Sequence, residues 1–128
     1  MVMDWHDTAL AAAGIVGGAV AIIHGALTQR LMVEPLAAMA GGPLRGPIRR
    51  IVPALLQFST FNWFVGGLAL LAAAYVLEPQ ARLATGLLVG SSYLYAALGN
   101  LWGTRGRHPG WALYTLALLL IGYGLSAP

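Results

Sequence analysis

Four long stretches of this chain contain no charged side chain, and this feature limits the fold more than any other. The stretches run from Thr8 to Gln29, from Ile51 to Leu77, from Leu83 to Thr104 and from Pro109 to Pro128. Each holds about 20 residues or more, the length that an α-helix needs to cross a hydrocarbon core of about 30 Å. The sequence therefore predicts an all-α integral membrane protein, a bundle of four transmembrane helices.

The composition is typical of a chain whose solvent is lipid. Apolar residues make up 59% of the chain and charged residues only 9%, whereas soluble domains contain about 25% charged residues. Such a chain has too few polar side chains to cover its surface in water. Its length is that of one membrane domain, residues 1–128. The acidic start, MVMDWHD, lacks the positive region of a signal peptide, so we expect the first span to be retained.

The connections between the spans differ in length. EPQAR joins the second span to the third, and the tight turn within GNLWGTRGRHPGW joins the third to the fourth, so both pairs are expected to be antiparallel hairpins. The connection from Arg30 to Arg50 is much longer and contains prolines and glycines. We expect its weakly apolar first half, Leu31 to Ala40, to lie flat at the membrane interface.

The arginines predict the orientation. All seven basic residues are arginines, and only Arg82 lies on the same side as the acidic N-terminus. Because basic residues are enriched in cytoplasmic loops, both termini are predicted on the outer side of a bacterial inner membrane. We expect anionic lipid headgroups at the cytoplasmic face to contact Arg45, Arg49, Arg50, Arg105 and Arg107. Nucleic acid is not an expected partner, because these arginines lie in short loops without interleaved aromatic side chains.

Small residues recur at four-residue spacing within the spans. The pairs are Gly14 with Gly18, Gly86 with Gly90, and Gly99 with Gly103. In lipid, such pairs let helix backbones approach closely. They are expected either to pack the four helices against one another or to associate copies of the chain into a homo-oligomer.

Each span also carries a polar side chain at a similar depth. His24 lies about 9 Å along the helix from Arg30, Gln57 about 10 Å from Arg50, and Asn100 about 7 Å from Arg105. Polar groups in lipid are costly unless paired, and they often mark a functional site. The candidate pocket on the cytoplasmic side comprises His24, Gln57, Thr60, Asn62, Asn100 and Tyr114. The alternative is that these side chains only hold the helices together by hydrogen bonds.

Familiar catalytic and metal-binding patterns are missing from the sequence. It has no cysteine, no Gly-x-Ser-x-Gly and no His-Glu-x-x-His. His24 has no second histidine or carboxylate at ligand spacing. We therefore predict no catalytic residue, no metal and no cofactor.

Three stretches resemble a group of uncharacterised small four-span bacterial membrane proteins. They are HGALTQRLMVEPL, RRIVPALLQFSTFNW and GRHPGW. In that group a Trp-His pair often occupies the positions of Leu56 and Gln57, followed by a threonine and a tryptophan that match Thr60 and Trp63. This chain has Leu56 and Gln57 in place of the Trp-His pair. The resemblance therefore does not imply a chemistry that depends on that histidine. The resemblance covers most of the chain and implies the four-span topology, without a function to carry over.

These features lead to three hypotheses about function. In the first, the chain is a non-catalytic membrane protein that self-associates or serves as an accessory subunit of a larger membrane complex. In the second, the polar layer binds or modifies a lipid or another lipophilic small molecule. In the third, two copies form a small transporter and the layer lines its path.

Overall fold

The structure, a computed structural model, describes residues 4–39 and 46–126, and all regular structure in these ranges is helical. The elements are α1 (Trp5–Thr28), the π-helical turn η1 (Gln29–Val33), α2 (Glu34–Ala38), α3 (Gly46–Tyr75), α4 (Pro79–Thr104) and α5 (Gly110–Leu125). α1 packs against α3 and α5, and α4 packs against the same two helices, so the long helices form a ring. The expected all-α bundle is confirmed.

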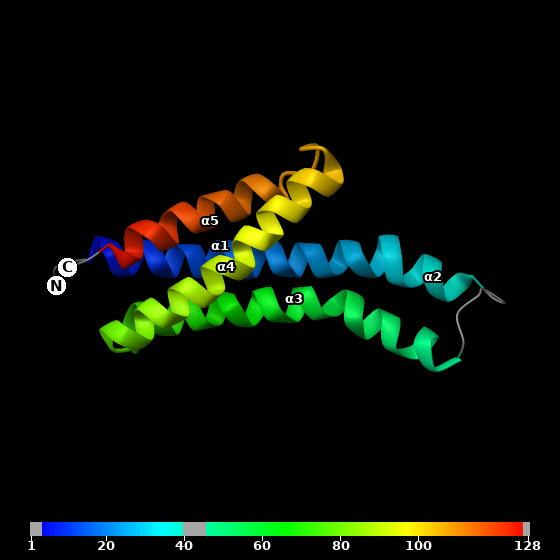
Figure 1. Cartoon of the computed structure of the whole chain (residues 1–128), viewed down its shortest axis with the longest axis horizontal. Coiled ribbons are helices and arrows are strands. Elements are labelled where there is room, and N and C mark those ends of the chain that lie inside the picture. The colour runs from blue at the N-terminus through cyan, green and yellow to red at the C-terminus, as the bar shows by residue number, and fades with distance from the viewer. Residues whose placement is uncertain (1–3, 40–45, 127–128) are drawn as a thin grey trace.

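The two ends of the bundle are built differently (Figure 1). The start of α1, the end of α5 and the turn between α3 and α4 lie together at one end. At the other end α4 and α5 turn back at residues 105–109, whereas α1, α2 and the first turns of α3 extend further. α4 runs obliquely between these ends, starting beside α3 and finishing beside α5.

In the described parts of the chain, two helical segments are long and apolar enough to cross a membrane, Trp5–Ala38 and Gly46–Tyr75. Their 34 and 30 residues give lengths of about 51 and 45 Å, more than a hydrocarbon core of about 30 Å requires. α5 is also apolar, but it has only 16 residues.

The first helix continues past its predicted end. It does not break at Arg30 but passes through η1 into α2, so the segment expected to lie flat continues the same helix as far as Ala38. Pro35, the second residue of α2, has no backbone N–H to donate to the turn before it. The π-helical turn η1, which is wider than an α-helical turn, lies directly before α2. Ala40, the predicted end of the flat segment, lies outside the described residues.

The other helix ends also differ from the predicted spans. α3 begins at Gly46 rather than Ile51 and contains Pro53, and α4 begins at Pro79 rather than Leu83. α4 ends with Arg105 in the left-handed conformation at φ 51°, followed by Gly106 at φ +75°. A glycine tolerates this backbone geometry at no steric cost, so the predicted tight turn has a physical basis here.

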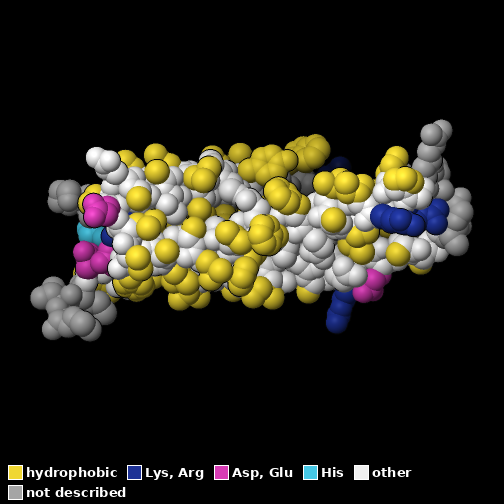
Figure 2. Space-filling view, turned by 90° about the horizontal axis from the view of Figure 1, so that it is seen from below, with side chains coloured by type: hydrophobic (Ala, Val, Ile, Leu, Met, Phe, Trp, Pro, Cys, Tyr) yellow, Lys and Arg dark blue, Asp and Glu magenta, His cyan; other side chains and the backbone are white. Residues whose placement is uncertain are grey.

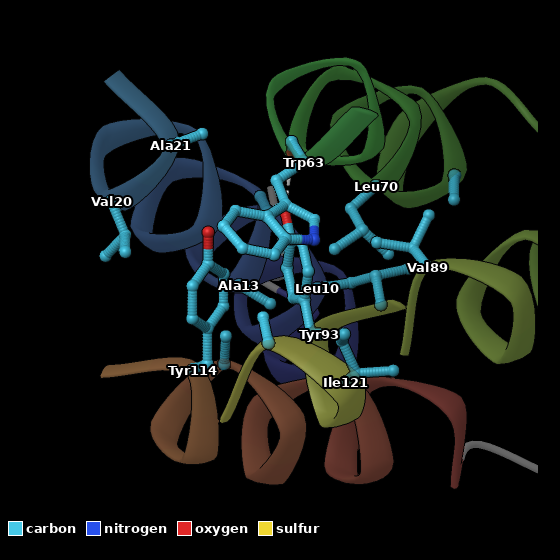
Figure 3. Packing of buried hydrophobic residues seen from close by; sticks show 14 of the residues in the cluster. Leu10, Ala13, Val20, Ala21, Trp63, Leu70, Val89, Tyr93, Tyr114 and Ile121 are labelled. Atoms are coloured by element: carbon cyan, nitrogen blue, oxygen red, sulfur yellow. Dashed lines mark hydrogen bonds between the residues drawn. The ribbon is translucent and has the colours of Figure 1, made fainter. Parts of the chain in front are cut away.

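The core is made mostly of small residues, with a few large side chains between them. The largest side chains that are fully buried are Leu10, Leu70, Tyr93 and Tyr114. Figure 3 shows Tyr93 between the helices, and a Cβ at Gly17 of α1 would overlap its phenol ring. The Tyr93 hydroxyl donates a hydrogen bond to the Trp63 carbonyl at 3.1 Å. Tyr93 therefore fixes the position of α4 against both α1 and α3.

Glycines bring α1 and α3 into backbone contact. A Cβ on Gly14 would lie 2.5 Å from the Gly67 carbonyl oxygen, and a Cβ on Gly67 would lie 3.0 Å from the backbone nitrogen of Gly18. Only glycine allows this approach, which is how helices associate in lipid.

The remaining predicted packing glycines lie on α4. A Cβ on Gly86 would meet the Leu125 side chain at 2.6 Å, and a Cβ on Gly90 would make ordinary contacts at 3.9 Å. Around Gly99 and Gly103, the described residues leave open space within 4 Å. The first half of α4 is therefore packed through its glycines, and the second half exposes them.

The outer surface of the bundle is strongly apolar. Large hydrophobic side chains are exposed on every long helix, among them Ile22, Phe58, Phe61, Leu88 and Leu119. Figure 2 shows one face on which charged side chains gather toward the two ends and hydrophobic side chains cover the band between them. A soluble monomer rarely exposes contiguous apolar surface of this kind.

Candidate functional site

The candidate site is centred on His24, in the half of α1 nearer to α2. Its Nε2 lies 3.2 Å from the Ser59 hydroxyl of α3 and 3.3 Å from the Thr28 hydroxyl, one turn further along α1. Sequence reasoning singled out His24 but missed both hydroxyls. Ser59 carried a signal that could have been used, because it lies between Gln57 and Thr60 in the predicted layer.

An aromatic chain connects His24 to the rest of the bundle. The His24 ring lies edge-on to Trp63 with 4.7 Å between centroids, and Trp63 lies edge-on to Tyr114 at 5.2 Å. Tyr114 in turn contacts Tyr93, with 5.0 Å between centroids. These four rings come from α1, α3, α5 and α4, so all four long helices meet at this level. Figure 3 shows the rings of Trp63, Tyr114 and Tyr93.

Tyr93 and Tyr114 are both fully buried, yet their hydroxyls differ. The Tyr93 hydroxyl is bonded to a carbonyl, whereas the Tyr114 hydroxyl has no hydrogen-bond partner among the described residues. Figure 3 shows Tyr114 reaching from α5 toward Val20 and Ala21 of α1. An unpaired buried hydroxyl costs roughly 1–3 kcal/mol, so it calls for a partner that the chain itself does not supply.

Two hollows lie beside His24. The first has a volume of about 90 Å³ and is lined by Val20, Ile23, His24, Asn100, His108, Pro109, Gly110, Leu113 and Tyr114. The second has a volume of about 240 Å³ and is lined by His24, Trp63, Tyr95, Ala96, Gly99, Asn100 and Thr104. His24 and Asn100 belong to both walls. They therefore lie between the two hollows.

Three of the six predicted pocket residues line the first hollow: His24, Asn100 and Tyr114. Asn100 donates through Nδ2 to the Ala96 carbonyl at 2.8 Å, one turn back on its own helix. His108 was not among the predicted pocket residues. Its position before the start of α5 brings it to the hollow because the α4–α5 turn folds back there.

The other three predicted pocket residues lie elsewhere. Gln57 donates through Nε2 to the Gly25 carbonyl at 3.1 Å, so it links α3 to α1. Asn62 donates to the Ser92 hydroxyl at 2.8 Å at an exposed contact between α3 and α4. Thr60 packs its methyl group against Gly25, and its buried hydroxyl has no partner among the described residues.

The predicted headgroup contacts lie near the end that carries the α4–α5 turn. Arg49 and Arg50 are in the first turns of α3, and Arg105 and Arg107 are in the turn that follows α4. Arg45 lies outside the described residues. The Trp111 indole donates to the Gly106 carbonyl at 3.1 Å and so holds this turn against the start of α5.

At the opposite end, polar side chains bond to one another. Arg82 of α4 forms an ion pair with Asp7 of α1 and donates to the Gly124 carbonyl of α5 at 2.9 Å. His6 stacks on Tyr123 with 4.7 Å between centroids, and its Nδ1 lies 2.8 Å from the Tyr123 carbonyl. We call these five residues the clasp. It joins α1, α4 and α5.

In the described ranges, no group of three or more His, Cys, Asp or Glu side chains is placed to hold a metal ion. No protein-family model, no curated protein and no solved structure matches this chain. Any statement about its function therefore rests on its own geometry.

Proposed function

We propose that the chain is an integral membrane protein of a bacterial inner membrane, with four spans and both termini on the outer side. The apolar outer surface and the band free of charged side chains support insertion into lipid (Figure 2). Arg49, Arg50, Arg105 and Arg107 lie toward one end and Arg82 toward the other, an asymmetry that favours the first end in the cytoplasm.

Cysteine labelling in intact cells tests this orientation, since the chain has no native cysteine. We expect Gln80→Cys, in the α3–α4 turn region, to react with a thiol reagent that cannot cross the membrane. Arg107→Cys, in the α4–α5 turn, is expected to react only after the cells are opened. Labelling of Arg107→Cys alone in intact cells contradicts the orientation.

Within that membrane protein, the first hollow is proposed to bind a lipophilic small molecule without catalysing a reaction on it. The observation that carries this proposal is Tyr114, which lines the hollow and whose buried hydroxyl has no partner among the described residues. His24 and Asn100 add polar groups to the same wall, and Val20 and Leu113 add apolar surface. Small-molecule sites commonly combine an apolar lining with a few convergent polar groups.

Native mass spectrometry of the protein, extracted from its own membrane in lipid particles, tests the binding. We expect a bound species of defined mass on the wild type, and its loss in His24→Leu and in Asn100→Leu. Gln57→Leu is the matched control, because Gln57 belongs to the same layer but does not line the hollow. A wild type without any bound species, or retention in both pocket variants, would overturn the binding proposal.

A second candidate function is self-association or service as an accessory subunit, with the second half of α4 as the contact surface. This half exposes Gly99 and Gly103 to open space, and beside them Tyr95 is 78% and Trp102 is 87% exposed. Small residues four positions apart allow a second helix to approach closely in lipid.

Leucine substitutions test whether Gly99 and Gly103 contact a second helix or only lipid. We expect Gly99→Leu and Gly103→Leu to shift the wild-type oligomer toward monomer in lipid particles. Gly122→Leu of α5 is the matched control, because Gly122 also has open space around it but lies on another helix. A wild type that is monomeric and carries no other subunit removes this candidate.

A further inference from the structure

The first hollow presents hydrogen-bond donors on a wall that otherwise consists of hydrocarbon. None of its described lining residues is an Asp, Glu, Lys or Arg. The polar groups come from Tyr114, His24, His108 and Asn100. What these groups offer to a ligand follows from the hydrogen bonds that they already make.

The two imidazoles differ in what they leave for a ligand. Nδ1 of His108 accepts the backbone N–H of Gly110 at 3.0 Å, which leaves the proton of the neutral ring on Nε2. Nε2 of His24 lies between the Thr28 and Ser59 hydroxyls, and the Ser59 hydroxyl donates to the Leu56 carbonyl at 3.4 Å. With the Tyr114 hydroxyl, the Nε2–H of His108 gives the lining residues two side-chain donors without a partner among the described residues. Asn100 uses Nδ2 for the Ala96 carbonyl, so its Oδ1 remains an acceptor.

The first residues of α5 add to this preference for negative charge. Pro109 and Gly110, which open the helix, both line the hollow. The backbone dipoles of a helix sum to a partial positive charge at its N-terminus, which favours anionic groups. Together with the buried, unpartnered Tyr114 hydroxyl, this helix start favours an oxyanion.

The size of the hollow limits how much of a ligand it can enclose. Its volume of about 90 Å³ is far below the roughly 300–1,000 Å³ of sites that enclose a whole drug-sized molecule. Ile23 is 56% exposed and Leu113 is 37% exposed, so the hollow reaches the apolar surface beside these side chains. A fitting ligand is therefore an elongated amphiphile with a small polar head, whose tail continues outside.

We propose that this hollow binds the carboxylate head of a single-chain amphiphile, such as a long-chain fatty acid. The Tyr114 hydroxyl and the His108 Nε2–H donate to its oxygens, and the tail leaves beside Ile23 and Leu113. A carboxylate suits this wall better than a phosphate monoester, because a dianion would need a cationic side chain that the lining lacks. A proton on either imidazole would balance the single charge of a carboxylate. The proposal rests on the binding function proposed above.

The test is a native mass spectrometry titration of the full-length chain in detergent micelles. The probes are oleate, oleyl alcohol and oleoyl lysophosphatidate, which share one tail and differ in the head. We expect oleate to bind at least about tenfold more tightly than oleyl alcohol, the effect of one charge-assisted hydrogen bond.

Tyr114→Phe is the decisive variant, because it removes only the hydroxyl. We expect it to weaken oleate binding about tenfold. Tyr93→Phe, which loses a hydroxyl bonded inside the protein, and Tyr123→Phe, at the clasp, are expected to bind oleate as the wild type does. The pair of controls keeps the comparison valid if one of them folds poorly.

Three results would overturn the proposal: equal binding of oleate and oleyl alcohol, tighter binding of lysophosphatidate than of oleate, or unchanged oleate binding in Tyr114→Phe. If oleyl alcohol binds as well as oleate and His24→Leu abolishes both, the carboxylate assignment fails while the proposed binding function stands. If no probe binds and the protein extracted from its membrane carries no small molecule, both fail.

Discussion

The clasp and the layer around His24 are both polar, but they differ in how far their hydrogen bonds are satisfied. At the clasp, Arg82 donates to both Asp7 and the Gly124 carbonyl, which joins three helices. Around His24, the Tyr114 and Thr60 hydroxyls are buried without partners among the described residues. The first arrangement is what a structural contact requires, and of the two unpaired hydroxyls only that of Tyr114 belongs to a residue that lines the first hollow.

The glycines of the two halves differ at some positions. Gly14 and Gly86, on the clasp side of the bundle, have no room for a side chain, whereas Gly99 and Gly103, on either side of Asn100 on α4, have open space around them. The contrast does not extend to every glycine, because a Cβ on Gly25 would lie 2.5 Å from the Thr60 methyl group and Gly122, near the clasp, has open space. Three substitution pairs test this comparison, and the first two have one member in either half.

The largest effect is expected from a side chain at the α1–α3 backbone contact. Gly14→Val would place its Cβ 2.5 Å from the carbonyl oxygen of Gly67, an atom that cannot rotate away. We expect a loss of about 3 kcal/mol in the free energy of unfolding, measured by denaturation in mixed micelles. Gly99→Val, in open space, is expected to leave that free energy unchanged within about 0.5 kcal/mol. Equal losses in both variants would end the distinction between the halves.

An intermediate effect is expected at the clasp itself. Arg82→Leu leaves Asp7 and the Gly124 carbonyl without their partner, and the side chains of the pair are only 19% and 29% exposed. We expect a loss of about 1–2 kcal/mol, between the values for exposed and buried ion pairs. Arg107→Leu in the α4–α5 turn is the control, for which thermal unfolding in lipid particles should reveal no loss. If Arg82→Leu causes no loss of stability, the clasp is only a surface contact.

The smallest effect is expected from the two buried tyrosines. Tyr93→Phe loses a hydrogen bond to the Trp63 carbonyl and should cost about 1 kcal/mol of unfolding free energy. Tyr114→Phe removes a hydroxyl without a partner, so ligand-free protein should be as stable as the wild type or more stable. A stability loss in Tyr114→Phe equal to that in Tyr93→Phe would indicate a structural role for this hydroxyl.

The long charge-free stretches predicted the helices well, because hydropathy and length suffice for that. The helix ends were harder to predict. Arg30 looks like the end of a span, but nothing in an arginine stops a helix, and η1 and α2 continue the helix through Pro35. Pro53 lies inside α3, as it does inside the predicted span from Ile51 to Leu77.

The sequence predicted the level of the candidate residues along their helices, but not the direction in which each side chain points. A rise of about 1.5 Å per residue places His24, Gln57 and Asn100 at one level, yet it does not tell which way each side chain points. In the structure His24 and Asn100 face the hollow, whereas Gln57 turns to the Gly25 carbonyl. The rotation of each helix depends on packing between helices, of which the contact of Gly17 with Tyr93 is an example. Neither residue carried a mark of that role in the sequence.

The contact between Gly17 and Tyr93 has a consequence for how this chain can change during evolution. Any side chain at position 17 overlaps the phenol ring at position 93, so the first substitution at Gly17 is tolerated only beside a smaller residue at position 93. The reverse order is open, because a smaller residue at 93 leaves a cavity that a later change at 17 can fill. Among related sequences, substitutions at positions 17 and 93 should therefore occur together, and the tyrosine should be replaced before the glycine.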